Sequence, residues 1–252
     1  MAIQPQRRAV DGKHTLNPAT DLIVPLDMTL GPGPRVVPGS VPIMHRKTTF
    51  GDGPVVRPQI GYNSTMDVQD SLSNQLLIAM PGMADPNFSS TVTLVCEHNA
   101  EGALGIVINR PMSLRLGGLF EQLSLDQADQ TVADSPILDG GPVGRERGFV
   151  IHKPLVDFES SVKVSPEIHL TLSRDVLDAM AAGTGPEKSL VALGYAGWEA
   201  GQLEQEMLHN TWLSVPASPE IVFDVPFSDR WSAAAEIIGI DISQISPHAG
   251  HA

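Results

Sequence analysis

Cysteine is nearly absent from this sequence, which contains a single thiol, Cys96, among 252 residues. One thiol cannot form an internal disulfide, so the class of disulfide-stapled secreted domains is excluded. Long apolar runs are also missing. None approaches the roughly 18 residues that span a bilayer, and no apolar stretch follows the arginines near the start. We therefore predict no membrane span and no secretory signal, and we expect a cytoplasmic protein.

Strong catalytic signatures are missing as well. The sequence has no G-x-x-x-x-G-K-[ST] phosphate loop, no G-x-G-x-x-G, no G-x-S-x-G, no H-E-x-x-H and no C-x-x-C. Each of these motifs supplies a mechanism with few substitutes. Nucleotide hydrolysis by a phosphate loop, dinucleotide redox chemistry and zinc proteolysis are therefore disfavoured. We predict no catalytic residue, no metal site and no cofactor.

Basic residues are scarce, and they are unevenly distributed. The whole chain has 16 Lys and Arg against 29 Asp and Glu. Residues 1–65 carry a net charge of +3, whereas residues 66–252 carry −16. Non-specific binding to nucleic acid depends on neutralising phosphates with Lys and Arg. Direct nucleic-acid binding by the acidic part is therefore disfavoured.

Residues 1–65 differ from the rest in composition. They contain 9 of the 21 prolines and 7 of the 23 glycines, and they lack apolar periodicity apart from three residues at 22–24. Such a segment cannot sustain a helix or a central strand, so we predict a disordered leader. Two alternatives stay open: a transit or tail segment, or a true translation start at Met66. Residues 66–252 are expected to form one folded domain.

The folded part shows the periodicities of both strands and helices. Apolar runs and alternation predict strands at residues 75–80, 91–97, 103–108, 148–152, 167–172, 190–195 and 221–223. Helices are expected at residues 114–123 and 201–210, after an N-cap at Ser173 up to Gly183, and from Ser228 to Gly239. A hairpin with a five-residue connection is expected to join the second and third strands. Strand pairs together with helices favour an α+β fold, in which helices flank a mixed β-sheet.

One polar stretch between two of these strands combines several reactive side chains. Cys96 is either a nucleophile activated by His98 or a buried core thiol, and its apolar neighbours favour the core. Glu97, His98, Asn109 and Arg110 form a candidate site at strand ends, where scaffolds often present chemistry. Arg110 could bind a carboxylate or phosphate, but a salt bridge to an acidic side chain is favoured.

Two glycine-rich stretches supply further candidates. Gly140 and Gly141, followed by Arg147, could form a backbone nest for a small anionic ligand, or a plain turn packed closely on a neighbour. Trp198 and Gln202 lie in a glycine-rich connection from a strand to a helix. They are candidates for a pocket wall, with a core aromatic as the plainer alternative.

Four stretches in this order resemble one family. LIAMPGMADPNFSSTV, EHNAEGALGIVINRP, GGPV followed by RGFVIH, and GYAGWEAGQLEQE are similar to the AlgH/YqgE (UPF0301) family over about residues 72–239. The resemblance implies an α+β fold with a layered sandwich and a smaller appended lobe. It also implies cytoplasmic residence and a role in transcriptional control, and it supplies no catalytic residues.

Three hypotheses about function follow. The first is a non-enzymatic regulatory or interaction protein that acts on transcription indirectly, through an unknown protein partner or a small anionic ligand. The second is a hydrolase or transferase that uses Glu97, His98, Asn109 and Arg110 in a shared strand-end cleft. The third, direct DNA recognition by the basic leader, is the least favoured.

Overall fold

The computed structural model describes residues 71–126 and 129–240, so the predicted leader lies outside the described residues. Within them the chain forms strands and short helices. The strands are β1 (Gln75–Ala79), β2 (Val92–Asn99), β3 (Gly102–Val107), β4 (Pro111–Arg115), β5 (Pro136–Asp139), β6 (Val143–His152), β7 (Ser161–Lys163), β8 (His169–Thr171), β9 (Ser189–Glu199) and β10 (Trp212–Pro216). The helices are α1 (Leu116–Gln122), α2 (Gln130–Ala133), α3 (Asp175–Ala181), α4 (Gln202–Leu208), α5 (Pro219–Phe223) and α6 (Arg230–Glu236).

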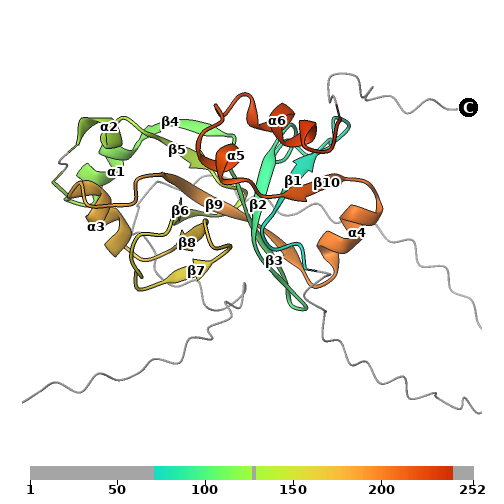
Figure 1. Ribbon diagram of the computed structural model, residues 1–252, viewed down its shortest axis with the longest axis horizontal. Helices are drawn as coiled ribbons and strands as arrows, with labels where there is room; N and C mark the ends of the chain where they lie inside the picture. Colours follow the sequence, from blue (N-terminus) through green and yellow to red (C-terminus); the bar gives the residue numbers. More distant parts are fainter. Residues whose placement is uncertain (1–70, 127–128, 241–252) are drawn as a thin grey trace, which may run out of the picture.

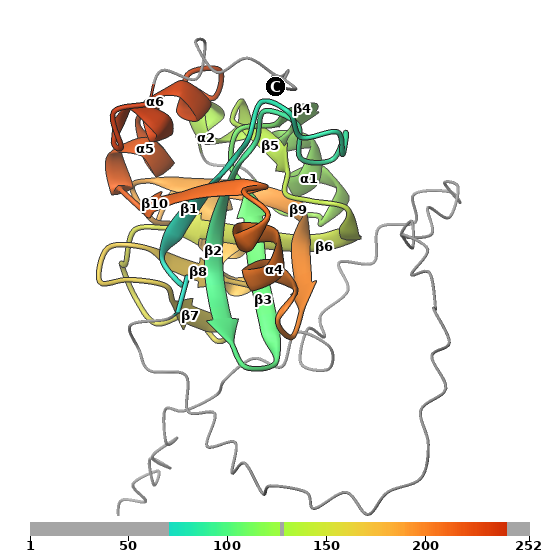
Figure 2. The same cartoon turned by 90° about the vertical axis from the view of Figure 1, so that its right-hand side faces the viewer.

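The strands form one mixed sheet in the order β10-β1-β2-β3-β9-β6-β8-β7, and β5 joins it by pairing with β4 and β9 (Figure 1). All pairs are antiparallel except the parallel pair of β5 and β9. Helices α5 and α6 lie on one side of β1 and β10, and α4 lies beside β3, β9 and β10 (Figure 2). The predicted mixed sheet with flanking helices is confirmed, which agrees with the α+β class. The layered sandwich with an appended lobe stays a prediction.

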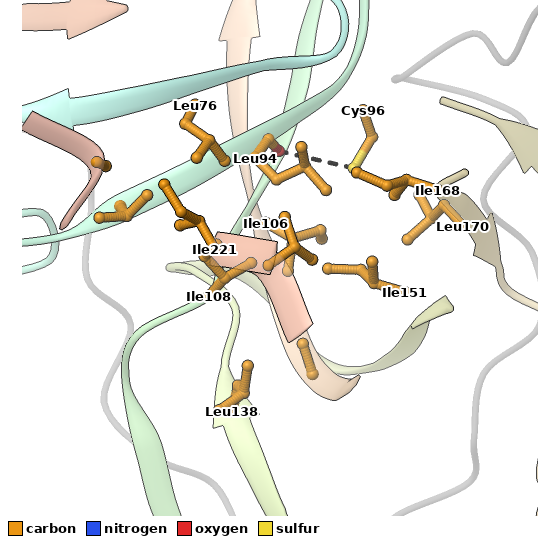
Figure 3. Close-up of a cluster of buried hydrophobic side chains, with 14 of the residues drawn as sticks. Leu76, Leu94, Cys96, Ile106, Ile108, Leu138, Ile151, Ile168, Leu170 and Ile221 are labelled. Atoms are coloured by element: carbon orange, nitrogen blue, oxygen red, sulfur yellow. Dashed lines mark hydrogen bonds between the residues drawn. The ribbon is translucent and has the colours of Figure 1, made fainter. Parts of the chain in front are cut away.

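Buried apolar side chains form three clusters around this sheet. The largest joins β1, β2, β3, β6 and β8 to α5 and α6, and Figure 3 shows its centre around Ile106 and Ile151. The second lies under α1 and α3, and the third lies under α4 around Trp198 and Trp212. Burying one such side chain contributes roughly 1.5–3 kcal/mol. Both faces of the central strands are therefore needed for stability.

One predicted strand, at residues 221–223, is wrong: these residues belong to helix α5. Pro219 occupies the start of the helix, where its fixed φ and missing N–H are tolerated. Ile221 and Val222 are buried in the largest cluster. A short apolar run is compatible with either a strand or a helix, and the preceding proline was the signal that favoured the helix.

The N-cap predicted at Ser173 is also wrong. Arg174 occupies that position without a side-chain cap, and the Ser173 hydroxyl donates to Asp175 Oδ1 instead. Gly183 follows the C-cap with a φ of 74°, as a helix stop requires. The stop was thus predictable from glycine alone, whereas the start depended on which polar group the serine contacts.

The hairpin of β2 and β3 is tighter than predicted. Strand β2 extends to Asn99 and β3 starts at Gly102, so the connection has two residues in place of five. Val95 pairs with Gly105 and Glu97 with Leu104, which leaves Cys96 as the extra residue of a β-bulge. Because of this extra residue, each side chain of β2 after Cys96 points to the opposite face of the sheet from the one that strict alternation predicts.

A buried arginine connects the C-terminal helices to the sheet. Arg230 is 2% exposed, and its Nε donates to the carbonyl of Val225 at 2.9 Å. Its terminal nitrogen donates to the carbonyl of Ile108, and its guanidinium lies 4.4 Å from the centre of the Phe227 ring. Burial lowers the pKa of Arg230 to about 10, and the nearby charge of Asp224 opposes this shift. The group therefore stays charged at neutral pH while its hydrogen bonds compensate for lost water.

Replacing Arg230 with alanine is expected to lower the free energy of unfolding by roughly 3–5 kcal/mol, because the buried carbonyl of Ile108 and the partly buried carbonyl of Val225 lose their donor. The matched control is Arg145→Ala, whose side chain is 62% exposed, and a change within about 0.5 kcal/mol is expected there. Chemical denaturation of both variants is the measurement. Equal losses in the two variants would contradict this role for Arg230.

Within residues 71–126 and 129–240, we find no helix that could span a bilayer.

Candidate functional site

The predicted strand-end site is divided between the two ends of the β2–β3 hairpin. In an antiparallel pair the end of the first strand lies beside the start of the second. Glu97 pairs with Leu104 near the turn, whereas Asn109 and Arg110 follow the far end of β3. Position 109 lies five residues along the chain from position 104, which corresponds to roughly 16 Å at ~3.3 Å per residue of extended chain. The structure therefore does not bring the four residues into one shared cleft.

His98 is a buried structural residue whose two ring nitrogens both have partners. Nδ1 accepts the backbone N–H of Leu72 at 2.9 Å, which assigns the ring proton to Nε2. Nε2 lies 3.2 Å from Glu204 Oε1 and donates to it. The ring thus connects the start of the described chain to α4. Neither nitrogen is left to act as a general base.

Cys96 faces the largest core cluster and is 4% exposed. Its Sγ donates to the carbonyl of Leu94 at 3.6 Å, and Figure 3 shows it beside Ile168. His98 pairs with Ala103, which belongs to the cluster under α4. The β-bulge therefore separates the thiol from the imidazole, and burial raises the pKa of the Cys96 thiol well above its usual range, with a smaller effect of the Glu97 charge. The interpretation of Cys96 as a core thiol is confirmed.

The Cys96 thiol is expected to react with a chromogenic aromatic disulfide at least about 100-fold more slowly in the native protein than in guanidinium chloride, because reaction requires opening of the core. The absorbance of the released thiolate measures both rates, and Cys96→Ala supplies the blank. Full reaction within minutes under native conditions would contradict the burial of this thiol.

Glu97 is half-buried beside the turn, and its Oε1 accepts from Asn99 Nδ2 at 3.0 Å. Burial raises the pKa of Glu97, the hydrogen bond from Asn99 lowers it, and the charge of Glu101 raises it further. The net direction is upward. The group therefore keeps its proton to higher pH in the folded chain than in the unfolded chain.

This shift makes stability depend on pH. The contribution of Glu97 is fully present below the unfolded pKa of about 4.3 and is lost as pH rises through the raised folded pKa. Glu97→Gln lacks this titration, so its free energy of unfolding is expected to improve relative to the wild type between about pH 4 and pH 7. Denaturation curves across this range measure the difference. The exposed Glu121→Gln is the control, and an equal trend in both variants would refute the assignment.

Asn109 and Arg110 hold the loop that follows β1. Asn109 Oδ1 accepts the N–H of Val92, and its Nδ2 donates to the carbonyl of Ser90 at 2.9 Å. The Arg110 guanidinium donates to the carbonyls of Asn87 and Ser89 at 2.7 and 2.8 Å. The salt bridge favoured for Arg110 is absent from the described part of the chain. Backbone carbonyls take the place of the expected carboxylate.

Gly140 and Gly141 lie close against β9. The N–H of Gly140 donates to the carbonyl of Leu193 at 2.8 Å, so it is not free for an anion. A Cβ at Gly140 would lie 2.3 Å from the carbonyl oxygen of Gly194. Only glycine, which has no Cβ, fits at this position. Arg147 lies 3.8 Å from a carboxylate oxygen of its neighbour Glu146. This geometry favours the plain, closely packed turn over the anion-binding nest.

A cavity of about 680 Å³ opens where the loop after β1 meets α4 and the facing ends of β9 and β10. It includes Trp198 and Gln202, the two candidates predicted for a pocket wall. Its lining consists of Met80, Pro81, Gly82, Met83, Ala84, Asp85, Phe88, Gly197, Trp198, Gln202, Glu206, His209, Asn210, Thr211 and Trp212. The cavity has the size of a small-molecule or side-chain site.

A single carboxylate organises this pocket. Glu206 Oε2 accepts the indole N–H of Trp198 at 3.0 Å and that of Trp212 at 2.8 Å. Its Oε1 accepts the side-chain amide of Gln202, one helical turn earlier on α4, at 2.9 Å. Hydrogen bonds to a charged acceptor contribute about 1.5–3 kcal/mol each. Glu206 therefore fixes the positions of both indoles.

Aromatic packing completes the wall. Phe88 stacks on Trp198 with ring centres 6.3 Å apart, and its ring meets Trp212 edge to face at 5.5 Å. Gly105 in β3 leaves space for the indole, because a Cβ there would lie 3.0 Å from the Trp198 ring. The pocket residues thus come from the loop after β1 and from β9, α4 and β10, which are distant in sequence.

Sequence reasoning missed most of these residues. Phe88 lies in a stretch that carries the family resemblance but was not predicted to be a site residue, and Trp212 is an isolated aromatic. Glu206 did carry a usable signal, because it lies four residues after Gln202 on the same predicted helix face. Among the residues that the structure describes, no group of three or more His, Cys, Asp or Glu side chains is arranged to hold a metal ion.

Comparison with known proteins gives consistent matches. A family model described as AlgH-like matches residues 76–243. A UPF0301 protein of Saccharophagus degradans is 54% identical over 183 residues, which cover 72% of this chain and 89% of that protein. A UPF0301 protein of Cupriavidus metallidurans is 52% identical over 189 residues, which cover 75% of this chain and 100% of that protein.

Solved structures agree with these matches. The solution structure of the AlgH protein from Pseudomonas aeruginosa has a TM-score of 0.61 and 49% identity, over 74% of this chain and 98% of that chain. A crystal structure of a protein from Corynebacterium diphtheriae has a TM-score of 0.54 at 19% identity, over 67% of this chain and 88% of that chain. This second likeness concerns the fold alone.

Proposed function

The chain belongs to the AlgH-like (UPF0301) family, and we propose that it is a cytoplasmic, non-enzymatic interaction protein that acts on transcription indirectly. The family match confirms the resemblance found from the motif-bearing stretches of the sequence. The proposed action takes place at the pocket organised by Glu206, where a protein partner binds.

The pocket is the observation that carries this proposal. It combines a cavity of about 680 Å³ with three aromatic rings whose positions are fixed by stacking and by hydrogen bonds to one carboxylate. Preorganised aromatic side chains bind with little loss of conformational entropy, which is why they dominate recognition sites. A rigid pocket of this kind is suited to holding a side chain or ligand without changing it.

The polar residues outside the pocket support a non-enzymatic role. The Cys96 thiol is buried in the core, and both ring nitrogens of His98 have partners. The Arg110 guanidinium is bound to two backbone carbonyls. The hydrolase or transferase alternative needs these groups free and close together, and no observation favours it over binding.

Charge supports an indirect effect on transcription. Residues 66–252 carry a net charge of −16, which repels the phosphates of nucleic acid. A protein of this charge influences a promoter more readily through another protein than by direct contact. Neither a small anionic ligand nor DNA recognition by residues 1–65 gains support from the pocket.

Filling the pocket tests the proposal. Gly82 lines the cavity, and a Cβ built there meets no atom within 4 Å, so Gly82→Trp is expected to fold normally and to obstruct the site. The matched control is Ser113→Trp, an exposed position on β4 outside the pocket lining. Both variants are introduced at the chromosomal gene, and co-purified proteins and transcript levels are compared with the wild type and a deletion.

We expect Gly82→Trp to lose a partner that Ser113→Trp retains, and to reproduce the transcript changes of the deletion, with both melting temperatures within about 2 °C of the wild type. Wild-type partners and transcripts in the Gly82→Trp strain would refute the proposed role of the pocket.

A further inference from the structure

The charge of Glu206 has no counter-ion within the described residues. Its oxygens accept three hydrogen bonds, all from neutral groups: two indoles and one amide. Among residues 71–126 and 129–240, no Lys or Arg nitrogen lies within 4.0 Å of this carboxylate. Asp85 adds a second carboxylate to the lining, which contains no Lys or Arg. The pocket therefore has acceptor charge available for a cation and opposes an anion.

The wall formed by the loop after β1 is largely apolar and adaptable, whereas Gln202, His209, Asn210 and Thr211 add polar groups on the other walls. Phe88 and the two methionines Met80 and Met83 line the cavity, with Pro81 between the methionines along the chain. Methionine side chains adjust to irregular hydrocarbon shapes, and aromatic rings bind both alkyl stems and cations. This combination suits a ligand with a hydrocarbon stem and a positive end.

An exposed apolar residue beside the pocket indicates the source of that ligand. Leu208, at the end of α4, is 82% exposed, and the next residue, His209, lines the cavity. A free small amine would fill the cavity and leave Leu208 in water. A protein surface that inserts one side chain into the cavity would also cover this leucine.

We propose that the pocket binds a lysine or arginine side chain of a protein partner, with its alkyl stem along Phe88 and the methionines and its cation facing Glu206. The inference rests on the proposed function, since it names the group that occupies the same pocket. Glu206 then has two roles: it positions both indoles from within, and it attracts the partner's positive charge from the cavity.

Three probes with the same hydrocarbon and different end groups test the charge preference: hexylammonium, hexanol and hexanoate. The full chain is titrated with each, and the indole N–H signals are followed in two-dimensional nitrogen-15 NMR spectra. Trp198 and Trp212 donate to Glu206 and report on the pocket, whereas Trp231 donates to the carbonyl of Ala79 and serves as an internal reference. Hexylammonium is expected to bind at least about tenfold more tightly than hexanoate, with hexanol between them.

Glu206→Gln separates the charge from the scaffold, because an amide oxygen still accepts from both indoles. We expect it to remove the advantage of hexylammonium over hexanol. Glu236→Gln, an exposed carboxylate on α6, is expected to bind all three probes as the wild type does. Equal affinity for the three probes, or preference for hexanoate, would overturn the inference.

Leu208→Ser tests the source. It is expected to weaken capture of the partner by at least about fivefold and to leave hexylammonium affinity unchanged, because only a macromolecule covers this residue. Unchanged partner capture would refute a protein as the source of the cation.

Failure of the proposed function would give a different result. The Gly82→Trp variant would then still capture the partner, whichever of the three probes binds most tightly. If Gly82→Trp loses the partner while the probes bind alike, the binding function stands and the cationic ligand is wrong.

Discussion

Strand β9 sets the constraint on which the rest of this structure depends. Its first half pairs with β5 and β6, and its second half pairs with β3, so one strand satisfies hydrogen bonds in both parts of the sheet. The change of neighbours requires close backbone approach. Gly194 adopts a φ of 76°, and Gly140 and Gly141 lie against it without room for side chains. These glycines are therefore needed for the sheet to remain continuous, and their role is structural.

The pocket follows from this arrangement. The end of β9 carries Trp198 past Gly105 of β3, and the chain then turns into α4, which brings Glu206 back over the indole. Strand β10 adds Trp212 to the same carboxylate. On the other side, Asn109 and Arg110 fix the loop that supplies Phe88. Asn109 and Arg110, which were candidate site residues, thus support the pocket from outside its lining.

Strands and helix ends with a clear local pattern could be predicted from the sequence. Features that depend on tertiary contacts could not. Alternation along β2 and the glycine stop at Gly183 were sufficient to predict those features. The strand predicted at Ile221 was wrong because three apolar residues carry no period. The β-bulge at Cys96 has no local signature, yet it decides that the thiol and His98 face opposite sides. Trp198 and Gln202 were predicted as wall residues, but Phe88 and Trp212 enter the pocket only through folding.

The pairing of β1 with β10 determines when the pocket can exist during synthesis. Gln75 pairs with Pro216, so two segments from opposite ends of the described chain must meet before the sheet edge is complete. Contacts between residues so far apart in sequence carry a large loop-closure cost and form late. The loop that holds Phe88 leaves the ribosome long before Trp212 does. A nascent or truncated chain can therefore form the hairpin of β2 and β3 and still lack the pocket, so the partner binding that we propose requires a chain synthesised through β10.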